Sequence, residues 1–396
     1  MQNDLQELAL RLDALVIFRD LLDDPVIGAL HRHLKTPGSA TYAAFVAELF
    51  KQDEQSLTGY VEQRVVDDDN AYTQRISEKK QISAYLESAV ALDLATLQAM
   101  VGLTREQLVT GIPEAAYLPD FDPGAQVDLS ALFHEHIAHV DQYGLGMFAR
   151  WHMFTLDGAG AIVPVLHPDT VRLHDLVDYE REKQVIVDNT EALLAGRPAA
   201  NILLTGDAGT GKSSTVKAVV NELKERGLRI LEVRKDQLHE IPAILDELTA
   251  NPLKFILFID DLSFSSNDDD YAALKAILEG SVAAKSRNVV VYATSNRRHL
   301  VKERFSDREG DEIHRNDTMQ EIISLSERFG IHVSFYRPNK DTYLNIVAKL
   351  TEQRNLSFDT AALYAAAEKF ALRRGGRSAR GARQFVDGLE AGSIQL

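Results

Sequence analysis

The fold of this 396-residue chain is decided by the stretch Gly206-Asp207-Ala208-Gly209-Thr210-Gly211-Lys212-Ser213. The stretch matches the pattern G-x-x-x-x-G-K-[ST] in full. An apolar run, Asn201-Ile-Leu-Leu-Thr205, comes directly before it, and a long amphipathic run follows it. We therefore expect a strand, a tight glycine-rich loop and the start of a helix, in this order. This is the arrangement that binds the phosphates of a nucleoside triphosphate.

Each part of the loop has a physical role in holding phosphate. Glycines let backbone N–H groups turn toward phosphate oxygens, and the helix that follows adds the positive end of its dipole. Lys212 supplies a charge for the β- and γ-phosphates, and Ser213 supplies a hydroxyl ligand for Mg²⁺. The residues expected to bind the nucleoside triphosphate are those of the loop, Gly206 to Ser213, together with Ser214.

A second stretch, Phe255-Ile-Leu-Phe-Ile-Asp260-Asp261, is an apolar strand that ends in two carboxylates. Ligands of parallel sheets sit at the carboxyl ends of the strands, so both acids are expected beside the phosphate loop. Asp260 would hold Mg²⁺ together with Ser213, largely through water. Asp261 would polarise the attacking water. The alternative is an ordinary solvated strand end, where Asp is common.

Further polar and basic residues follow in the C-terminal half. Asn296, or Ser295 before it, ends another apolar strand and could orient water or contact the γ-phosphate. Arg328 precedes the last expected strand, where it could point at a neighbouring subunit's nucleotide or be a surface charge only. Arg380 and Arg383 are three residues apart and share a helix face, so one of them could fold over the phosphates. A solvated basic face or a nucleic-acid contact is the alternative for that arginine cluster.

The composition of the chain argues against several kinds of binding partner and chemical site. The chain has 43 Lys and Arg against 59 Asp and Glu, a net charge of −16, which argues against a general electrostatic grip on nucleic acid or anionic membrane. It has no cysteine, which excludes disulfides, Cys-based zinc sites and thiol nucleophiles. The N-terminus is acidic and polar, unlike a secretory signal, and no apolar run approaches the ~20 residues of a membrane span. We expect a cytoplasmic protein that does not bind membranes.

The secondary structure expected from the sequence changes along the chain. Residues 1–120 have helical periodicity, as in Leu5, Leu8, Leu12 and Leu15, and Pro25 is expected to end the first helix. The Pro- and Gly-rich stretch 121–168 is expected to be a linker that can contain a hairpin. Residues 169–336 alternate strands and helices, which indicates a parallel sheet, and 337–396 are helical. Five strands are expected, at 201–205, 228–233, 254–260, 288–294 and 331–336.

Residues 169–390 resemble an AAA+ ATPase module. The order of parts matches: the lead-in Leu176-Val-Asp-Tyr-Glu180, the phosphate loop, the acidic strand, a sensor-1 strand and a helical lid. Three stretches resemble, more narrowly, an uncharacterised (domain of unknown function) family of bacterial AAA+ ATP-binding proteins. They are Ile259-Asp-Asp-Leu-Ser-Phe264, Tyr292-Ala-Thr-Ser-Asn-Arg-Arg-His-Leu300 and Leu325-Ser-Glu-Arg-Phe-Gly330.

The resemblance implies an α/β fold, an αβα P-loop sandwich of the AAA+ type with a five-stranded parallel sheet. A C-terminal helical lid and a mainly helical N-terminal domain complete it. ATP and Mg²⁺ are the implied cofactors. The implied roles are Lys212 and Ser213 at phosphate and Mg²⁺, Asp260 as the metal-side acid, Asn296 as sensor 1, Arg328 as finger, and Arg380 or Arg383 as sensor 2.

Two positions depart from the family's pattern. Most AAA+ proteins have Glu where this chain has Asp261, and relatives tend to have Glu where it has Ser265. Slow basal hydrolysis is therefore expected.

Several functions are compatible with these motifs. The first is a homo-oligomeric ATPase that remodels or loads a macromolecular partner, with a protein favoured over nucleic acid and residues 1–120 as the recognition domain. The second is a nucleotide-gated scaffold with negligible hydrolysis, which the departures at Asp261 and Ser265 favour. A protein-threading unfoldase ranks third, because Arg234-Lys-Asp-Gln-Leu-His-Glu-Ile-Pro242 lacks the aromatic residue and glycine of a threading loop. DNA loading stays open through the arginine cluster.

Two groups of histidines are candidate metal ligands. His134-Glu-His136-Ile-Ala-His139 resembles a zinc helix, but H-E-x-x-H requires a histidine where the chain has Ala138. His31 and His33 are spaced for opposite faces of a helix and are expected to be ordinary surface residues. No metal site is expected at either group.

Overall fold

The computed structural model describes residues 2–52, 56–262, 274, 278, 287–296 and 328–396. The chain forms two compact units, Met1–Arg150 and Trp151–Leu396. The expected boundaries at residues 120 and 168 therefore differ from the division seen in the structure. Phe121, Leu129 and Phe133 are buried in the same apolar core as Leu8 and Leu30, which explains why the first unit extends to residue 150.

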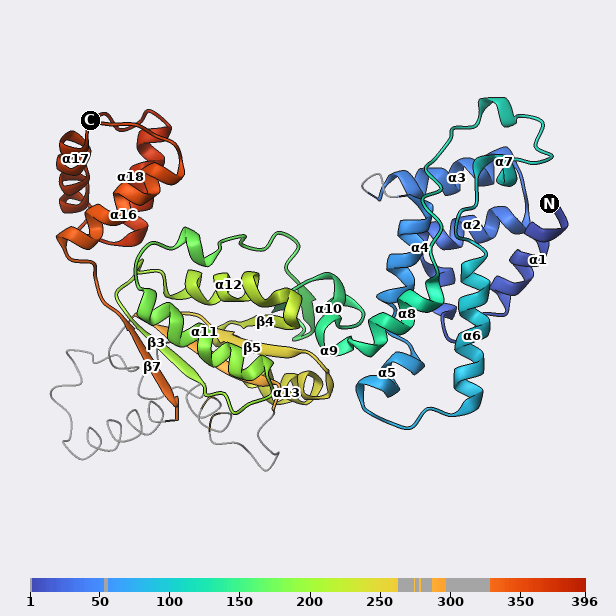
Figure 1. Ribbon diagram of the computed structural model, residues 1–396, viewed down its shortest axis with the longest axis horizontal. Coiled ribbons are helices and arrows are strands. Elements are labelled where there is room, and N and C mark those ends of the chain that lie inside the picture. Colours follow the sequence, from blue (N-terminus) through green and yellow to red (C-terminus); the bar gives the residue numbers. More distant parts are fainter. Residues whose placement is uncertain (1, 53–55, 263–273, 275–277, 279–286, 297–327) are drawn as a thin grey trace. The chain divides into compact units, whose positions relative to one another are not determined.

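The regular secondary structure in the described residues of unit 1 is helical, with loops between the helices (Figure 1). Its helices are α1 Gln2–Asp13, α2 Pro25–Lys35, α3 Ser39–Phe50, α4 Leu57–Val66, α5 Ala71–Ser77, α6 Ala84–Gln98, α7 Arg105–Leu108, α8 Leu129–Ala138, α9 Val140–Tyr143 and α10 Met147–Arg150, with 3₁₀ turns η1 Arg19–Asp23 and η2 Ala115–Tyr117.

Pro25 begins a helix, whereas the sequence led us to expect that it ends one. α1 already ends at Asp13, and Pro25 is the first residue of α2. The carboxylate of Asp24 caps α2 by accepting from the backbone N–H groups of Val26 (2.9 Å) and Ile27 (3.0 Å). A proline at the first helical position loses no hydrogen bond, because that N–H has no partner inside the helix.

The expectation that His31 and His33 lie on the surface is wrong. His33 is 1% exposed, with Nδ1 3.0 Å from the Thr41 hydroxyl and Nε2 2.9 Å from the Leu108 carbonyl oxygen. His31 is buried as well, with Nε2 3.2 Å from an Asp13 oxygen. Neighbouring segments cover both faces of α2, which the spacing of two histidines within one helix cannot reveal. Burial lowers the pKa of His33 below its usual range.

Unit 2 is built on one mixed sheet. In the described residues its strands are β1 Met153–Leu156, β2 Ile162–Pro164, β3 Ile202–Gly206, β4 Leu228–Val233, β5 Lys254–Ile259, β6 Val289–Ser295 and β7 Ile331–Phe335. Their order is β2-β1-β4-β5-β6-β3-β7, parallel except for the antiparallel hairpin β1–β2.

The expected five-stranded sheet is therefore corrected to seven strands in the described part of the chain. The two additional strands, β1 and β2, form an antiparallel hairpin in the stretch 121–168, which we expected to be a linker that can contain a hairpin. Both are short and surrounded by Gly and Pro, so their sequence has the composition of a loop. Pairing with β4, through Met153–Ile230 and Phe154–Leu231, makes β1 part of the sheet.

Helices α11 Glu180–Leu194 and α12 Lys212–Leu223 lie over one face of this sheet (Figure 1). They bury alternate strand residues such as Leu204, Ile230 and Phe258. The intervening residues, among them Leu257, are buried as well, as expected for a parallel sheet covered on both faces. Helix α13, Ile241–Ala250, and the 3₁₀ turns η3 Leu173–Asp175, η4 Lys224–Arg226 and η5 Lys235–Glu240 complete the described part of this αβ core.

Three helices follow β7 and have an apolar core of their own. They are α16 Lys340–Gln353, α17 Thr360–Arg373 and α18 Ala379–Glu390, and their core includes Tyr343 and Phe385. We call them the C-terminal helices. No helix in the described segments of either unit has the length and apolarity needed to cross a membrane.

Asp68, between α4 and α5, makes the stability of unit 1 depend on pH. Burial, with smaller contributions from Asp20 and Asp69, raises the pKa of Asp68 to about 6, above the 3.8 of an exposed carboxyl. The folded state therefore binds the proton more tightly than the unfolded state. The resulting destabilisation is absent below pH ~4, grows between pH ~4 and ~6, and is complete above pH ~6, where it amounts to at most about 3 kcal/mol.

We expect Asp68→Asn to remove this dependence. The free energy of unfolding of the wild type, relative to the variant, should rise by about 1–3 kcal/mol when the pH falls from 7.5 to 5. Hydrogen exchange of the α4 and α5 amides in the full chain, corrected for intrinsic rates, measures this difference. A difference between wild type and variant that is the same at both pH values would contradict the assignment.

Candidate functional site

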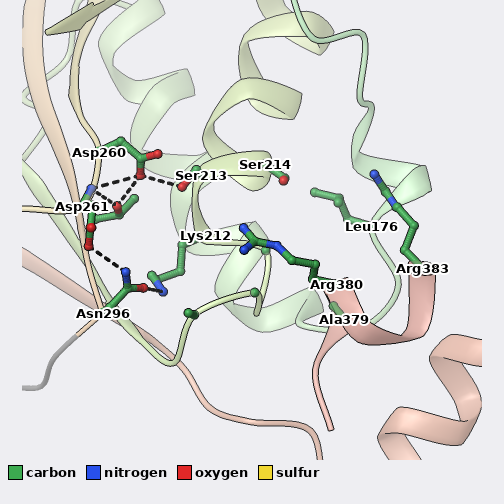
Figure 2. A pocket seen from close by; sticks show the side chains of 14 residues that line it. Leu176, Lys212, Ser213, Ser214, Asp260, Asp261, Asn296, Ala379, Arg380 and Arg383 are labelled. Atoms are coloured by element: carbon green, nitrogen blue, oxygen red, sulfur yellow. Dashed lines mark hydrogen bonds between the residues drawn. The ribbon is translucent and has the colours of Figure 1, made fainter. Parts of the chain in front are cut away.

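A pocket of about 400 Å³ lies at the carboxyl ends of β3, β5 and β6, beside α18 (Figure 2). Its size is within the ~300–1,000 Å³ of small-ligand sites. The pocket brings together most of the site residues that the sequence predicted. The predicted residues in its lining are Ala208, Gly209, Gly211, Lys212, Ser213, Ser214, Asp260, Asp261, Asn296, Arg380 and Arg383.

The glycines of the loop are required by its backbone. Gly206 has φ +140°, and a Cβ there would lie 2.0 Å from the carbonyl oxygen of Phe335 on the paired strand β7. Gly209 and Gly211 have φ of +78° and +99°, a region that residues with a Cβ rarely adopt. Gly211 also caps α12, so the loop passes directly into the helix N-terminus.

A hydrogen bond within the loop stabilises this turn. Thr210 is 1% exposed, and its hydroxyl donates to the carbonyl oxygen of Asp207 at 2.9 Å. Gly206, Asp207 and Thr210 shape the loop but are not among the residues that line the pocket in the described part of the chain.

Lys212 extends back along the loop. Its Nζ donates to the carbonyl oxygens of Gly206 and Asp207 and to Oδ1 of Asn296, each at 2.9 Å. The residue is 5% exposed, and burial lowers the pKa of its ammonium below the usual range. The nearby carboxylates of Asp260, Asp207 and Asp261 oppose this shift. The Lys212 ammonium is thus held inside the pocket by bonds to uncharged oxygens, and the oxygens of a bound anion can take the place of these acceptors.

The two acids that follow β5 have different surroundings, as Figure 2 shows. Asp260 Oδ1 accepts from the hydroxyls of Ser213 (2.6 Å) and Thr294 (2.5 Å). Asp261 Oδ1 accepts from the amide of Asn296 at 2.7 Å. Asn296 therefore lies between Lys212 and Asp261 and contacts both.

The C-terminal helices contribute two arginines to the lining. The backbone N–H of Arg380 donates to the carbonyl oxygen of Gly209 at 3.0 Å, which holds the start of α18 against the loop. The side chain of Arg380 points toward Lys212 and Ser213, whereas that of Arg383 points toward Leu176 (Figure 2). A third arginine, Arg377, precedes these two in the chain and is bound within the C-terminal helices, by two bonds of 2.8 and 2.7 Å to Glu368.

Arg328 does not join this group within its own chain. It lies in the turn before β7, half-buried, and is not among the described residues that line the pocket. A role at the nucleotide of a neighbouring subunit therefore stays a prediction. Ser265 and the whole stretch 297–327, which precedes Arg328, lie outside the described residues.

Sequence reasoning missed several residues beside the loop, among them Thr294, Leu176, Arg337 and Ala379. Thr294 lines the pocket and contacts both acids. Leu176 forms part of the wall, and Arg337 lies with Nε 3.3 Å from Asp207 Oδ1. Only Thr294 had a readable signal, because residues two apart in a strand face the same side, so it shares a face with Asn296.

His136, on α8, contacts neighbouring groups of unit 1. His136 Nε2 is 2.9 Å from the carbonyl oxygen of Gly144, and its ring stacks on Tyr143. In the segments that the structure describes, no three His, Cys, Asp or Glu side chains come together as metal ligands.

A strand, a glycine-rich loop with Lys and Ser, a helix, and a second strand that ends in two acids define the class: a phosphate-loop protein. The chain belongs to the family described as "Protein of unknown function (DUF815)", whose match spans residues 147–393. No curated protein matches the chain in sequence.

Solved structures of RuvB from Thermotoga maritima, titled a Holliday junction branch migration motor, are similar to this chain at 16% identity and a TM-score of 0.38. The match covers 56% of this chain and 64% of RuvB, so the chain spans less than two thirds of that protein's length. A single-residue variant of RuvB matches at 15% identity and a TM-score of 0.37, covering 57% of this chain and 65% of that one.

Proposed function

We propose that this chain binds ATP with Mg²⁺ and hydrolyses ATP slowly to remodel or load a macromolecular partner. One observation carries the proposal. Lys212, Ser213, Asp260, Asp261 and Asn296, which come from three different segments, line one pocket at the mouth of a phosphate loop. A structural ion-pair network would not require a glycine turn that leaves space at Gly211, where a Cβ would have no neighbour within 4 Å.

The residues present fit both cofactors. Backbone N–H groups at the start of α12 and the Lys212 ammonium suit phosphate oxygens. Mg²⁺ in nucleotide sites is usually held by one or two protein oxygens together with phosphates and water, which the pair Ser213 and Asp260 can supply. When bound, Mg²⁺ neutralises phosphate charge and orients the γ-phosphoryl group for attack.

The chain's own residues then have separate tasks. Lys212 exchanges its bonds with Gly206, Asp207 and Asn296 for phosphate oxygens. Release from Lys212 leaves Oδ1 of Asn296 free to accept from a water and so orient it next to Asp261, whose carboxylate accepts the proton of that water. Arg380, which points toward Lys212 in Figure 2, is the better placed of the two arginines to reach the phosphates. The C-terminal helices would thus act as a lid.

The partner is proposed to be a protein bound by unit 1. Residues 1–150 contain 23 Asp and Glu against 11 Lys and Arg, which is the wrong sign for binding a polyanion such as DNA. We also propose a cytoplasmic homo-oligomer in which Arg328 of one subunit reaches the nucleotide of the next. These parts of the proposal rest on the sequence resemblance and on charge.

A nucleotide-gated scaffold with negligible hydrolysis is the second candidate. It is favoured by the bond between Asn296 and Asp261, which occupies the proposed base, and by the short side chain at this position. The two candidates share ATP binding and differ in turnover.

ATP binding is tested by replacing Lys212. Lys212→Ala removes a charge-assisted contact to phosphate worth about 1.5–3 kcal/mol, so the affinity for ATP should fall by roughly tenfold or more. Titration with a fluorescent ATP analogue measures this. Lys217→Ala is the matched control, since Lys217 lies on the same helix but pairs with Glu232 at 3.0 Å. Equal affinity in the wild type and Lys212→Ala would contradict the proposed site.

A further inference from the structure

The backbone at Asp261 turns in a way that few residues other than glycine adopt. Its φ is +54°, in the left-handed region. Asp and Asn are enriched there among residues with a Cβ, because a short polar side chain can bond locally. A Glu in the same conformation lacks this advantage. The acid that departs from the family's pattern is therefore the acid that suits the backbone at this position.

Thr294, at the end of the neighbouring strand β6, holds this turn in place. Its hydroxyl oxygen accepts from the backbone N–H of Asp261 at 2.9 Å, and the same hydroxyl donates to Asp260 Oδ1 at 2.5 Å. One residue further on, the N–H of Leu262 donates to the carbonyl oxygen of Thr294 at 2.7 Å. Thr294 thus contacts three consecutive residues at the point where β5 ends.

The Thr294 hydroxyl links the orientation of the Asp260 side chain to the direction of the Asp261 backbone. Thr294 is 2% exposed, so no bulk water can take over its bonds. Ser213, the other hydroxyl on Asp260 Oδ1, is the residue proposed to turn to Mg²⁺. Thr294 would then be the hydroxyl that still orients Asp260, while it fixes the direction in which Asp261 leaves the strand.

We propose that Thr294 is a positioning residue for the metal-side acid and the base, and that the left-handed turn adapts this site to Asp rather than Glu at 261. This inference rests on the proposed ATP and Mg²⁺ site. Thr294 does not touch the reacting atoms and acts through Asp260 and Asp261. Its hydroxyl, not its methyl group, is the part that matters.

The test compares Thr294→Val, which keeps the shape and removes the hydroxyl, with Thr294→Ser, which keeps the hydroxyl. Residues that orient metal ligands typically contribute about 10- to 100-fold to metal affinity or activity. We expect Thr294→Val to lower kcat by this factor and to lose most of the gain in ATP affinity that Mg²⁺ gives. Its ATP affinity without Mg²⁺ should stay at the wild-type value. Thr294→Ser should behave like the wild type in all three measurements.

Thr351→Val is the control for loss of a buried threonine hydroxyl, because the Thr351 hydroxyl donates to the carbonyl oxygen of Val347 in its own helix at 2.7 Å, away from the pocket. Its kcat should not change. Asp261→Glu is the second variant, and its kcat should fall below that of the wild type. A Thr294→Val protein with wild-type kcat and Mg²⁺ dependence, or an Asp261→Glu protein at least as fast as the wild type, would overturn the inference.

The outcomes separate this inference from the proposed function. If the wild type binds ATP but does not hydrolyse it, the ATPase proposal fails, and the Mg²⁺ dependence of binding in Thr294→Val still decides the role of Thr294. If Thr294→Val does not fold, the kcat of Asp261→Glu and the kcat and Mg²⁺ dependence of Thr294→Ser decide whether the inference holds.

Discussion

Replacing Asp261 by Asn is expected to lower the rate of ATP hydrolysis by about 10²- to 10⁴-fold while ATP still binds. An amide cannot accept the proton of the attacking water, so the step that needs a base is lost. The amide has nearly the shape of the carboxylate, and the loop contacts of Lys212 do not involve Asp261. Phosphate release at saturating ATP and titration with a fluorescent ATP analogue measure the two quantities separately.

Asp246→Asn is the matched control, because Asp246 is an exposed carboxylate on α13 outside the pocket. It should hydrolyse ATP at the wild-type rate. Wild-type turnover in Asp261→Asn would mean that another group is the base. Absence of turnover in the wild type itself, with ATP bound, would instead favour the nucleotide-gated scaffold.

Arg328→Ala is expected to depress turnover by about 10³- to 10⁵-fold, with a much smaller effect on ATP affinity. An arginine that reaches a neighbour's nucleotide stabilises charge that develops on the phosphoryl group only in the transition state. Arg328 lies in the turn before β7 and does not line its own described pocket, so its effect should come from the next subunit. Arg181→Ala, which removes an exposed arginine on α11, serves as the control and should leave turnover unchanged.

Mixing two inactive proteins tests the action between subunits. Homogeneous Arg328→Ala and homogeneous Lys212→Ala should each be nearly inactive. Mixed oligomers contain interfaces at which an intact phosphate loop meets an intact Arg328, so activity should return in proportion to these interfaces. Full activity of Arg328→Ala alone, or a purely monomeric protein in mass measurements with ATP, would reduce Arg328 to a surface charge.

The parts of the fold that depend on local pattern were predictable. The five strands expected from apolar runs match β3 to β7 within one residue at either end, because buried parallel strands have continuous apolar sequences. A hairpin was expected in the stretch 121–168, but its place in the sheet was not predictable, since the short strand β1 joins the sheet only by pairing with the distant strand β4. The extent of unit 1 was missed for the same reason: Phe121 and Phe133 are buried by helices far away in sequence.

The candidate site, like the fold, was predictable where it depends on short motifs and not where it depends on distant contacts. The loop and the acids carry their chemistry in short motifs, and the structure brings Lys212, Asp260 and Asn296 into one pocket. Sequence spacing could not choose between Arg380 and Arg383, because the choice depends on where α18 begins relative to Gly209. The left-handed backbone of Asp261 was equally hidden, since a single φ angle has no counterpart in residue spacing.

Isothermal titration of ATP into the full-length wild-type chain, with and without Mg²⁺, tests the central claim most directly. The account predicts saturable binding of one nucleotide per chain that is tighter when Mg²⁺ is present, because Ser213 and Asp260 can then hold the metal. Absence of binding heat under both conditions, confirmed by absence of retained nucleotide in equilibrium dialysis, would contradict the claim that this pocket is a nucleotide site.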